Sequence, residues 1–166
     1  MASGAGFPIG PAMKSVRVGK AWQAALLAST TCVILSLTLL VEGRRPVGTN
    51  LAPFEDVGRL LLHSRRGDLF TGRFLLGALG IVGNLFLFVP WGFLAWKFLD
   101  GAGRSAFRIH LEVLFFGVLL SAGIEFIQLF LPTRAADVDD IIWNVLGTAV
   151  GSLLAHIGRQ VHVEWE

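Results

Sequence analysis

Four long apolar runs constrain the fold of this chain more than any other feature. They cover residues 22–41, 74–96, 113–131 and 141–157, are 17 to 23 residues long, and contain a single charged residue, Glu125. A helix needs about 20 apolar residues to cross the roughly 30 Å hydrocarbon core of a bilayer. Only 16% of all residues are charged, against about a quarter in soluble domains. The sequence therefore predicts an all-α polytopic membrane protein, a bundle of four transmembrane helices.

The four runs also define the domain organisation. Residues 1–20 are predicted to be a disordered N-terminal tail, because their first half is rich in Gly, Ala and Pro. Residues 21–158 form one transmembrane domain, and residues 159–166 form a C-terminal tail. An even number of spans places both termini on the same side of the membrane. Lys and Arg residues near the span ends are divided evenly between the two sides, so the positive-inside rule does not orient the chain.

The segment between the first two spans, residues 42–73, is the one sizeable polar region. Within it, residues 54–66 carry apolar side chains on one face and arginines that can reach lipid headgroups. Thr49 or Asn50 is the expected N-cap, with Pro53 in the first turn. This pattern is typical of a short helix lying in the membrane interface, and it also fits an amphipathic helix packed on the bundle.

The second run contains a proline and a polar residue. Pro90 cannot donate a backbone hydrogen bond, so we expect a kink there. Gly77, Gly80 and Asn84 recur at spacings of three and four and share one face of a helix. Small residues let helices approach closely, and a buried amide can hydrogen-bond across helices. Asn84 is therefore either a packing residue or part of a polar site.

Polar and small residues form one stripe on each of the last two predicted helices. The third run carries Gly117, Ser121, Glu125 and Gln128, and the fourth segment carries Asp137, Asp140, Asn144, Gly147 and Gly151. A tight turn at Pro132 and Thr133 would bring the polar members of both stripes together. Counted from the end of its run at 1.5 Å per residue, Glu125 is expected about 9 Å deep. The two glycines permit a close neighbour, while Asp139 points elsewhere and is expected in solvent.

A carboxylate inside a span is costly unless it is paired, and it usually marks function. Arg134 is the nearest cation in the sequence, and its planar guanidinium suits a carboxylate partner. The polar groups together exceed what packing requires. We therefore favour a functional site over a set of polar contacts that only fixes the register in which the helices pack.

These residues lie in three blocks that resemble the VanZ-like family of small bacterial membrane proteins. The blocks are NLAPF at 50–54, GNLFLFVPWGFL at 83–94 and IEFIQLFLPTRAADVDDIIWNVLGTAVG at 124–151. The resemblance covers about residues 44–157 and includes Asn84, Pro90 and the polar residues of the third block. It implies a helical bundle in the bacterial cytoplasmic membrane, with cytoplasmic termini and with the polar blocks near the external face. The family's namesake is linked to teicoplanin resistance, so the resemblance also implies a contribution to glycopeptide tolerance.

Three functions fit these residues best, and a fourth, transport, would require the protein to oligomerise because four spans are few. In the first, a polar pocket at the outer membrane face binds a lipid-like, lipid-linked or amphiphilic cell-envelope compound. Arg134 would take an anionic group, Gln128 and Asn144 would fix orientation, and the kinked second span would admit a tail. In the second, an intramembrane enzyme acts on lipid-linked envelope material, with Glu125 as general acid or base. In the third, the protein is a structural or partner scaffold.

The candidate ligand-binding residues are Asn84, Glu125, Gln128, Arg134, Asp137, Asp140 and Asn144. Glu125 is the candidate catalytic residue, and Asp137 and Asp140 are candidate ligands of a divalent cation, which prefers oxygen ligands. The sequence names no cofactor. No Ser/His or Cys/His pair stands out. The expected partners are membrane lipids or an amphiphilic cell-envelope compound and not nucleic acid, and a homo-oligomer is compatible with the sequence.

Overall fold

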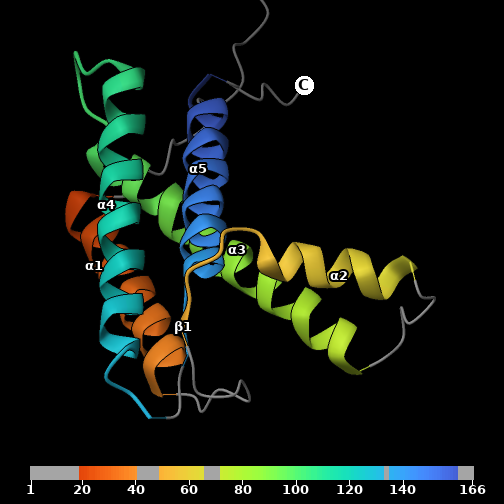
Figure 1. The fold of residues 1–166 in the computed structure, drawn as a ribbon. Helices are drawn as coiled ribbons and strands as arrows, with labels where there is room; N and C mark the ends of the chain where they lie inside the picture. The colour runs from red at the N-terminus through yellow and green to blue at the C-terminus, as the bar shows by residue number, and fades with distance from the viewer. Residues whose placement is uncertain (1–18, 41–48, 66–71, 133–134, 161–166) are drawn as a thin grey trace, which may run out of the picture.

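The computed structural model describes residues 19–40, 49–65, 72–132 and 135–160, and Figure 1 shows their arrangement. Five helices and two short strands account for most of these residues, with a π-helical continuation of the first helix. The elements are α1 (Lys20–Leu35), η1 (Ser36–Leu40), β1 (Thr49–Asn50), α2 (Glu55–Arg65), α3 (Gly72–Leu99), α4 (Ala106–Gln128), β2 (Ala136–Asp137) and α5 (Val138–Gln160).

Four of the helices are long and apolar enough to cross a membrane: Lys20–Leu40, Gly77–Leu99, Ala106–Gln128 and Val138–Arg159. The predicted all-α bundle of four spans is confirmed. The third span ends earlier than the apolar run does, because the amides of Leu129, Phe130 and Leu131 bond to carbonyls of the last turn and Pro132 follows. The fourth begins earlier, at Val138, and so includes the acidic residues before its apolar run.

The contact between α3 and α5 is the closest in the bundle. A Cβ atom on Gly147 would lie 2.2 Å from the carbonyl oxygen of Leu85, and one on Gly151 would lie 2.0 Å from that of Val89. Gly92 makes the reciprocal contact, where a Cβ would lie 2.2 Å from the Thr148 carbonyl oxygen. The prediction that the two glycines of α5 permit a close neighbour is confirmed, and that neighbour is α3. The helix remains continuous through Pro90.

The first helix is tied to α3 by polar contacts at two levels. The indole nitrogen of Trp91 donates to the Thr31 hydroxyl at 2.9 Å, and the Thr31 hydroxyl itself bonds to the carbonyl one turn earlier. Lys20 donates to carbonyl oxygens at the end of α3 and just beyond it, including that of Asp100 at 2.6 Å, where a cation is favoured by the helix dipole. Arg159 reaches the Asp100 side chain. The start of α1 and the end of α5 therefore lie on the same side of the bundle.

The second helix lies across the direction of α4 and α5 and runs beside the first half of α3 (Figure 1). It packs through Leu60, whose side chain lies 3.4 Å from a Cβ built on Gly77, while Leu61 and Leu62 are exposed. The expected N-cap at Thr49 or Asn50 is wrong. Those residues form β1, which pairs in parallel with β2, and the helix begins only at Glu55. Contact of α2 with the membrane interface stays a prediction.

Candidate functional site

A partly open pocket of about 530 Å³ lies between η1, the middle of α3, the end of α4 and the start of α5. Its polar lining includes five of the residues that the sequence nominated, namely Asn84, Glu125, Gln128, Asp140 and Asn144. Four helices thus contribute to one site, and the two polar stripes converge as their spacing required. Arg134 and Thr133, which were expected to complete the site and its turn, lie outside the described residues.

Glu125 connects α4 to the strand that precedes α5. Its side chain is 6% exposed, and its Oε2 atom accepts the backbone N–H of Asp137 at 2.8 Å. Since α4 ends at Gln128, Glu125 lies in the last turn, about 4.5 Å from the helix end at 1.5 Å per residue. Residues 129–131 leave the helix, and the expected depth of about 9 Å in the bilayer stays a prediction.

Gln128 holds α1 against α4. Its Nε2 atom donates to the backbone carbonyl oxygen of Thr38 at 3.0 Å. Thr38 belongs to the last turn of η1, where carbonyl groups have no partner within the helix. The π-helical segment was not predicted from the sequence, and such segments are frequent at functional sites. One donor of the Gln128 amide is therefore engaged in fixing a wall of the pocket.

Asn144 lines the pocket and joins α5 to α4. The residue is 2% exposed, and its Nδ2 atom donates to the Ser121 hydroxyl at 2.9 Å. Its Oδ1 atom is buried and has no hydrogen-bond partner among the described residues. Buried polar atoms are nearly always paired, and an exception calls for an explanation such as a missing ligand or water. Side-chain atoms of Trp96, Asp100 and Trp143 share this property, and the Asn144 atom has almost no exposed surface, so it does not by itself indicate a ligand in the pocket.

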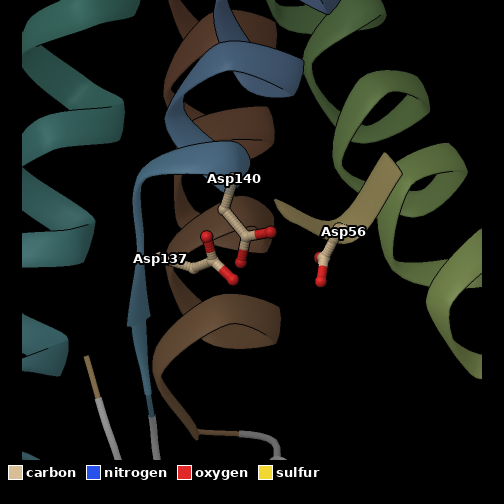
Figure 2. Close-up of side chains that lie close together, drawn as sticks. All are labelled: Asp56, Asp137 and Asp140. Carbon is tan, nitrogen blue, oxygen red and sulfur yellow. The ribbon is translucent and has the colours of Figure 1, made fainter. Parts of the chain in front are cut away.

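Three carboxylates gather beside the pocket, and Figure 2 shows them facing one another from separate segments. One oxygen from each of Asp56, Asp137 and Asp140 lies within 4.8 Å of the others. The Asp56 side chain is only 12% exposed and lies 3.8 Å from the Arg59 guanidinium. The sequence placed Asp137 and Asp140 together but missed Asp56. Its position depends on the pairing of β1 with β2, which brings the start of α2 to the start of α5.

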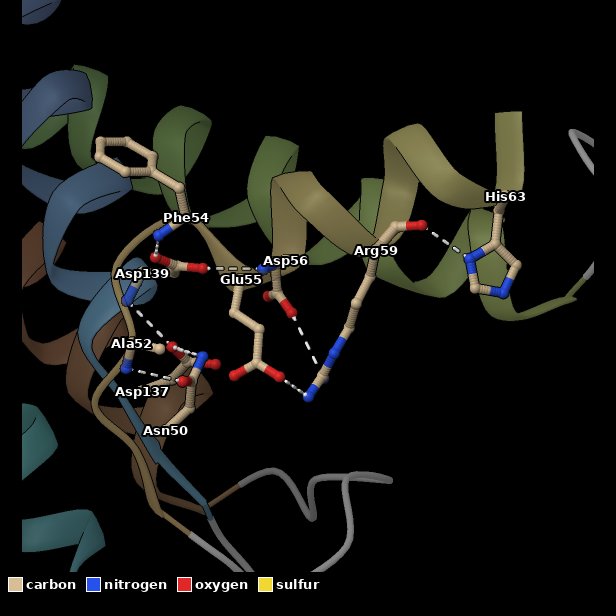
Figure 3. A network of polar contacts seen from close by, with 9 residues as sticks. All are labelled: Asn50, Ala52, Phe54, Glu55, Asp56, Arg59, His63, Asp137 and Asp139. Atoms are coloured by element: carbon tan, nitrogen blue, oxygen red, sulfur yellow. Dashed lines mark hydrogen bonds and ion pairs between the residues drawn. The ribbon is translucent and has the colours of Figure 1, made fainter. Parts of the chain in front are cut away.

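Asp139 stabilises this junction and is not in solvent as expected. The residue is fully buried, and its carboxylate accepts the backbone N–H groups of Phe54 and Asp56 at the start of α2 (Figure 3). The first amides of a helix lack partners within it and attract negative charge. Phe54 has a φ of 63°, a left-handed conformation that costs a non-glycine residue about 1–2 kcal/mol. Asp139 thus holds a strained turn in place.

Asp137 is the centre of the same network. Its Oδ1 atom accepts the amide of Asn50 at 3.0 Å and the backbone N–H of Asp139 at 2.9 Å (Figure 3). Asn50 in turn accepts the backbone N–H of Ala52 through its side-chain oxygen. Asn50 was not nominated as a site residue, although it opens the NLAPF block. The network shapes the carboxylate cluster from both strands.

A second polar cluster lies at the opposite end of the bundle. His110 contacts the Ser152 hydroxyl at 2.6 Å through Nδ1 and His156 at 3.0 Å through Nε2. The ring of His156 stacks on Trp96 with centroids 5.6 Å apart. The sequence analysis did not single out this Ser/His pair, because helix packing brings together residues 42 positions apart. Ser152 is 1% exposed, so its hydroxyl joins two helices and is not open to a substrate.

Comparison with known proteins identifies the family. The family model described as VanZ/LLP1 matches residues 21–159, which is most of the chain and includes every nominated site residue. Searches of curated proteins and of solved structures gave no match. The match covers all four candidate spans except the first residue of α1. This chain therefore belongs to the VanZ/LLP1 family and has the four-helix architecture of a multi-pass membrane protein.

Proposed function

We propose that the pocket binds the polar head of a lipid-like, lipid-linked or amphiphilic cell-envelope compound at the outer face of the bacterial cytoplasmic membrane. The observation that carries this proposal is that polar side chains from three helices, those of Asn84, Glu125, Gln128 and Asp140, line one pocket. The pocket volume of about 530 Å³ falls in the range of about 300–1,000 Å³ that is usual for small-molecule sites.

The lining selects a head that can hydrogen-bond. Asn84 and Gln128 offer carboxamides, whereas Glu125 and Asp140 are carboxylates. A head that donates hydrogen bonds, such as a hydroxyl or an amine, meets this set of acceptors. Arg134 remains the proposed partner for an anionic group on the same compound. A pocket of this kind would contribute to glycopeptide tolerance by binding an envelope lipid on which such antibiotics depend.

Native mass spectrometry of the protein in mild detergent tests the proposal. We expect the wild type to retain one lipid-sized adduct and Glu125→Gln to lose it. The substitution keeps an oxygen that can accept the Asp137 amide and so should leave the fold intact.

The matched control is Glu112→Gln on the same helix. Its side chain is 39% exposed and pairs with Arg104 near the other end of α4, and pairs this exposed contribute about 1 kcal/mol or less. This variant should keep the adduct. A wild type without an adduct, or equal retention by both variants, would contradict the proposed function.

The carboxylate cluster supports a second candidate, metal-assisted chemistry on lipid-linked envelope material. Hard divalent cations take carboxylate and amide oxygens as ligands, and Asp56, Asp137 and Asp140 bring oxygens from three segments within 4.8 Å. A cation there would lie next to Asp140, which also lines the pocket, and it could bind the phosphate of a lipid. Glu125 would serve as general acid or base in this candidate.

Binding of Mn²⁺, followed by the loss of its free-ion electron paramagnetic resonance signal, tests the second candidate. We expect saturable binding by the wild type, loss in Asp140→Asn, and no change in Asp100→Asn, which alters an aspartate at the opposite end of the bundle. An absence of saturable Mn²⁺ binding by the wild type would rule out the metal-assisted candidate and leave the binding function untouched.

A further inference from the structure

The polarity of the pocket is reversed relative to a site that opens to water. Its deep residues are polar, since Glu125, Gln128 and Asn144 are 6%, 5% and 2% exposed. Its outer residues are apolar, since Leu37 and Phe86 are 46% and 66% exposed. A mouth rimmed by large exposed apolar side chains is stable in hydrocarbon and costly in water. The rim therefore faces the bilayer.

The two sides of the mouth come from different spans. Leu37 belongs to η1, and Phe86 belongs to α3 about two turns inside the span that begins at Gly77. Gly83, one turn before, is exposed and lines the pocket, and a Cβ built on it would meet no atom within 4 Å. The η1 side is held by the bond from Gln128 to the Thr38 carbonyl. The mouth is thus a fixed lateral opening whose floor is polar.

We propose that the pocket opens sideways into the bilayer between η1 and α3, and that its occupant is a membrane lipid that enters head first while its chain remains in the hydrocarbon. This inference rests on the proposed function and narrows its ligand class. A water-soluble head without a chain would have to cross the apolar rim and would lack the contact with Leu37 and Phe86. A lipid already in the leaflet would place its head against the polar floor of the pocket and its chain against the apolar rim.

Gly83→Leu tests the opening directly. The new side chain has open space at its Cβ and a better helix propensity than glycine by about 1 kcal/mol, so the variant should fold, yet it fills the mouth. Gly123→Leu is the matched control, because Gly123 is an exposed glycine of α4 that meets no atom within 4 Å and does not line the pocket. Circular dichroism during thermal unfolding would confirm that both variants fold.

The readout is native mass spectrometry after release from nanodiscs of palmitoyl-oleoyl phosphatidylethanolamine and phosphatidylglycerol in equal parts. We expect wild type and Gly123→Leu to retain one phospholipid, Gly83→Leu to lose at least about tenfold in retention, and excess glycerol 3-phosphate not to displace the lipid. Retention by Gly83→Leu together with loss in Glu125→Gln would overturn lateral entry and leave the proposed function standing. Displacement by glycerol 3-phosphate would also overturn it. A wild type that retains nothing would refute both.

Discussion

Replacing Gly151 by alanine tests the close contact between α3 and α5 on which one side of the pocket depends. The added Cβ would lie 2.0 Å from the Val89 carbonyl oxygen and 2.7 Å from the Phe93 nitrogen, and real Cβ atoms essentially never lie under 3.0 Å from such atoms. Both atoms belong to the backbone, so no side-chain rotation relieves the clash. The helices must separate by about 1 Å, and overpacking of this kind costs about 1–3 kcal/mol in the free energy of unfolding.

Gly158→Ala is the control in the same helix, because a Cβ there meets no atom within 4 Å. Alanine favours the helix over glycine by about 1 kcal/mol, so the control should be neutral or slightly stabilising. The measurement is reversible unfolding by sodium dodecyl sulfate in mixed micelles, followed by circular dichroism. We expect Gly151→Ala to be less stable than Gly158→Ala by about 1–3 kcal/mol. Equal stability of the two variants would show that the helices are not in backbone contact at this position.

Three further predictions concern other parts of the molecule. Asp139→Ala leaves two amides at the start of α2 without their acceptor, at about 1–3 kcal/mol per group, so hydrogen exchange should accelerate in α2 but not in α4; unchanged protection of α2 would contradict this. His156→Phe keeps the stacking on Trp96 but loses the contact with His110, so the free energy of unfolding should fall by about 0.5–1.5 kcal/mol. Lipid retention should be unchanged. A loss of lipid as large as that in Glu125→Gln would contradict this and show that the histidine cluster acts on the pocket. In intact cells and a cysteine-free background, an impermeant thiol reagent should label a cysteine replacing Ser64 but not one replacing Ser105, and the opposite labelling would place the pocket at the cytoplasmic face.

The sequence predicted the bundle well because its signals are local. Long uncharged runs define the spans, and the spacing of Glu125 and Gln128 with Asp140 and Asn144 defines two stripes that can only meet at one end of the bundle. The helix period of 3.6 residues makes such stripes readable without knowledge of the neighbours. The glycines of α5 were likewise readable as a close contact, although the sequence did not say that α3 makes it.

The features that were missed depend on contacts between distant segments. Asp56 joins the carboxylate cluster only because β1 pairs with β2, and strands of two residues leave no periodic signal. Asp139 was assigned to solvent from its angle on α5, since no local pattern indicates that its carboxylate accepts the first amides of α2. The π-helical turn around Thr38 accepts the Gln128 amide from α4, a partner 90 residues away in the sequence. Each of these features therefore involves a contact with a segment distant in the sequence.

A crystal structure grown in a lipidic mesophase tests the central claim most directly, because the protein then remains surrounded by lipid. We predict continuous density for one lipid in the pocket, with its head within hydrogen-bond distance of Glu125 or Gln128 and its chain leaving between Leu37 and Phe86. A pocket occupied only by isolated water molecules, with lipid chains confined to the outside of the bundle, would contradict the account.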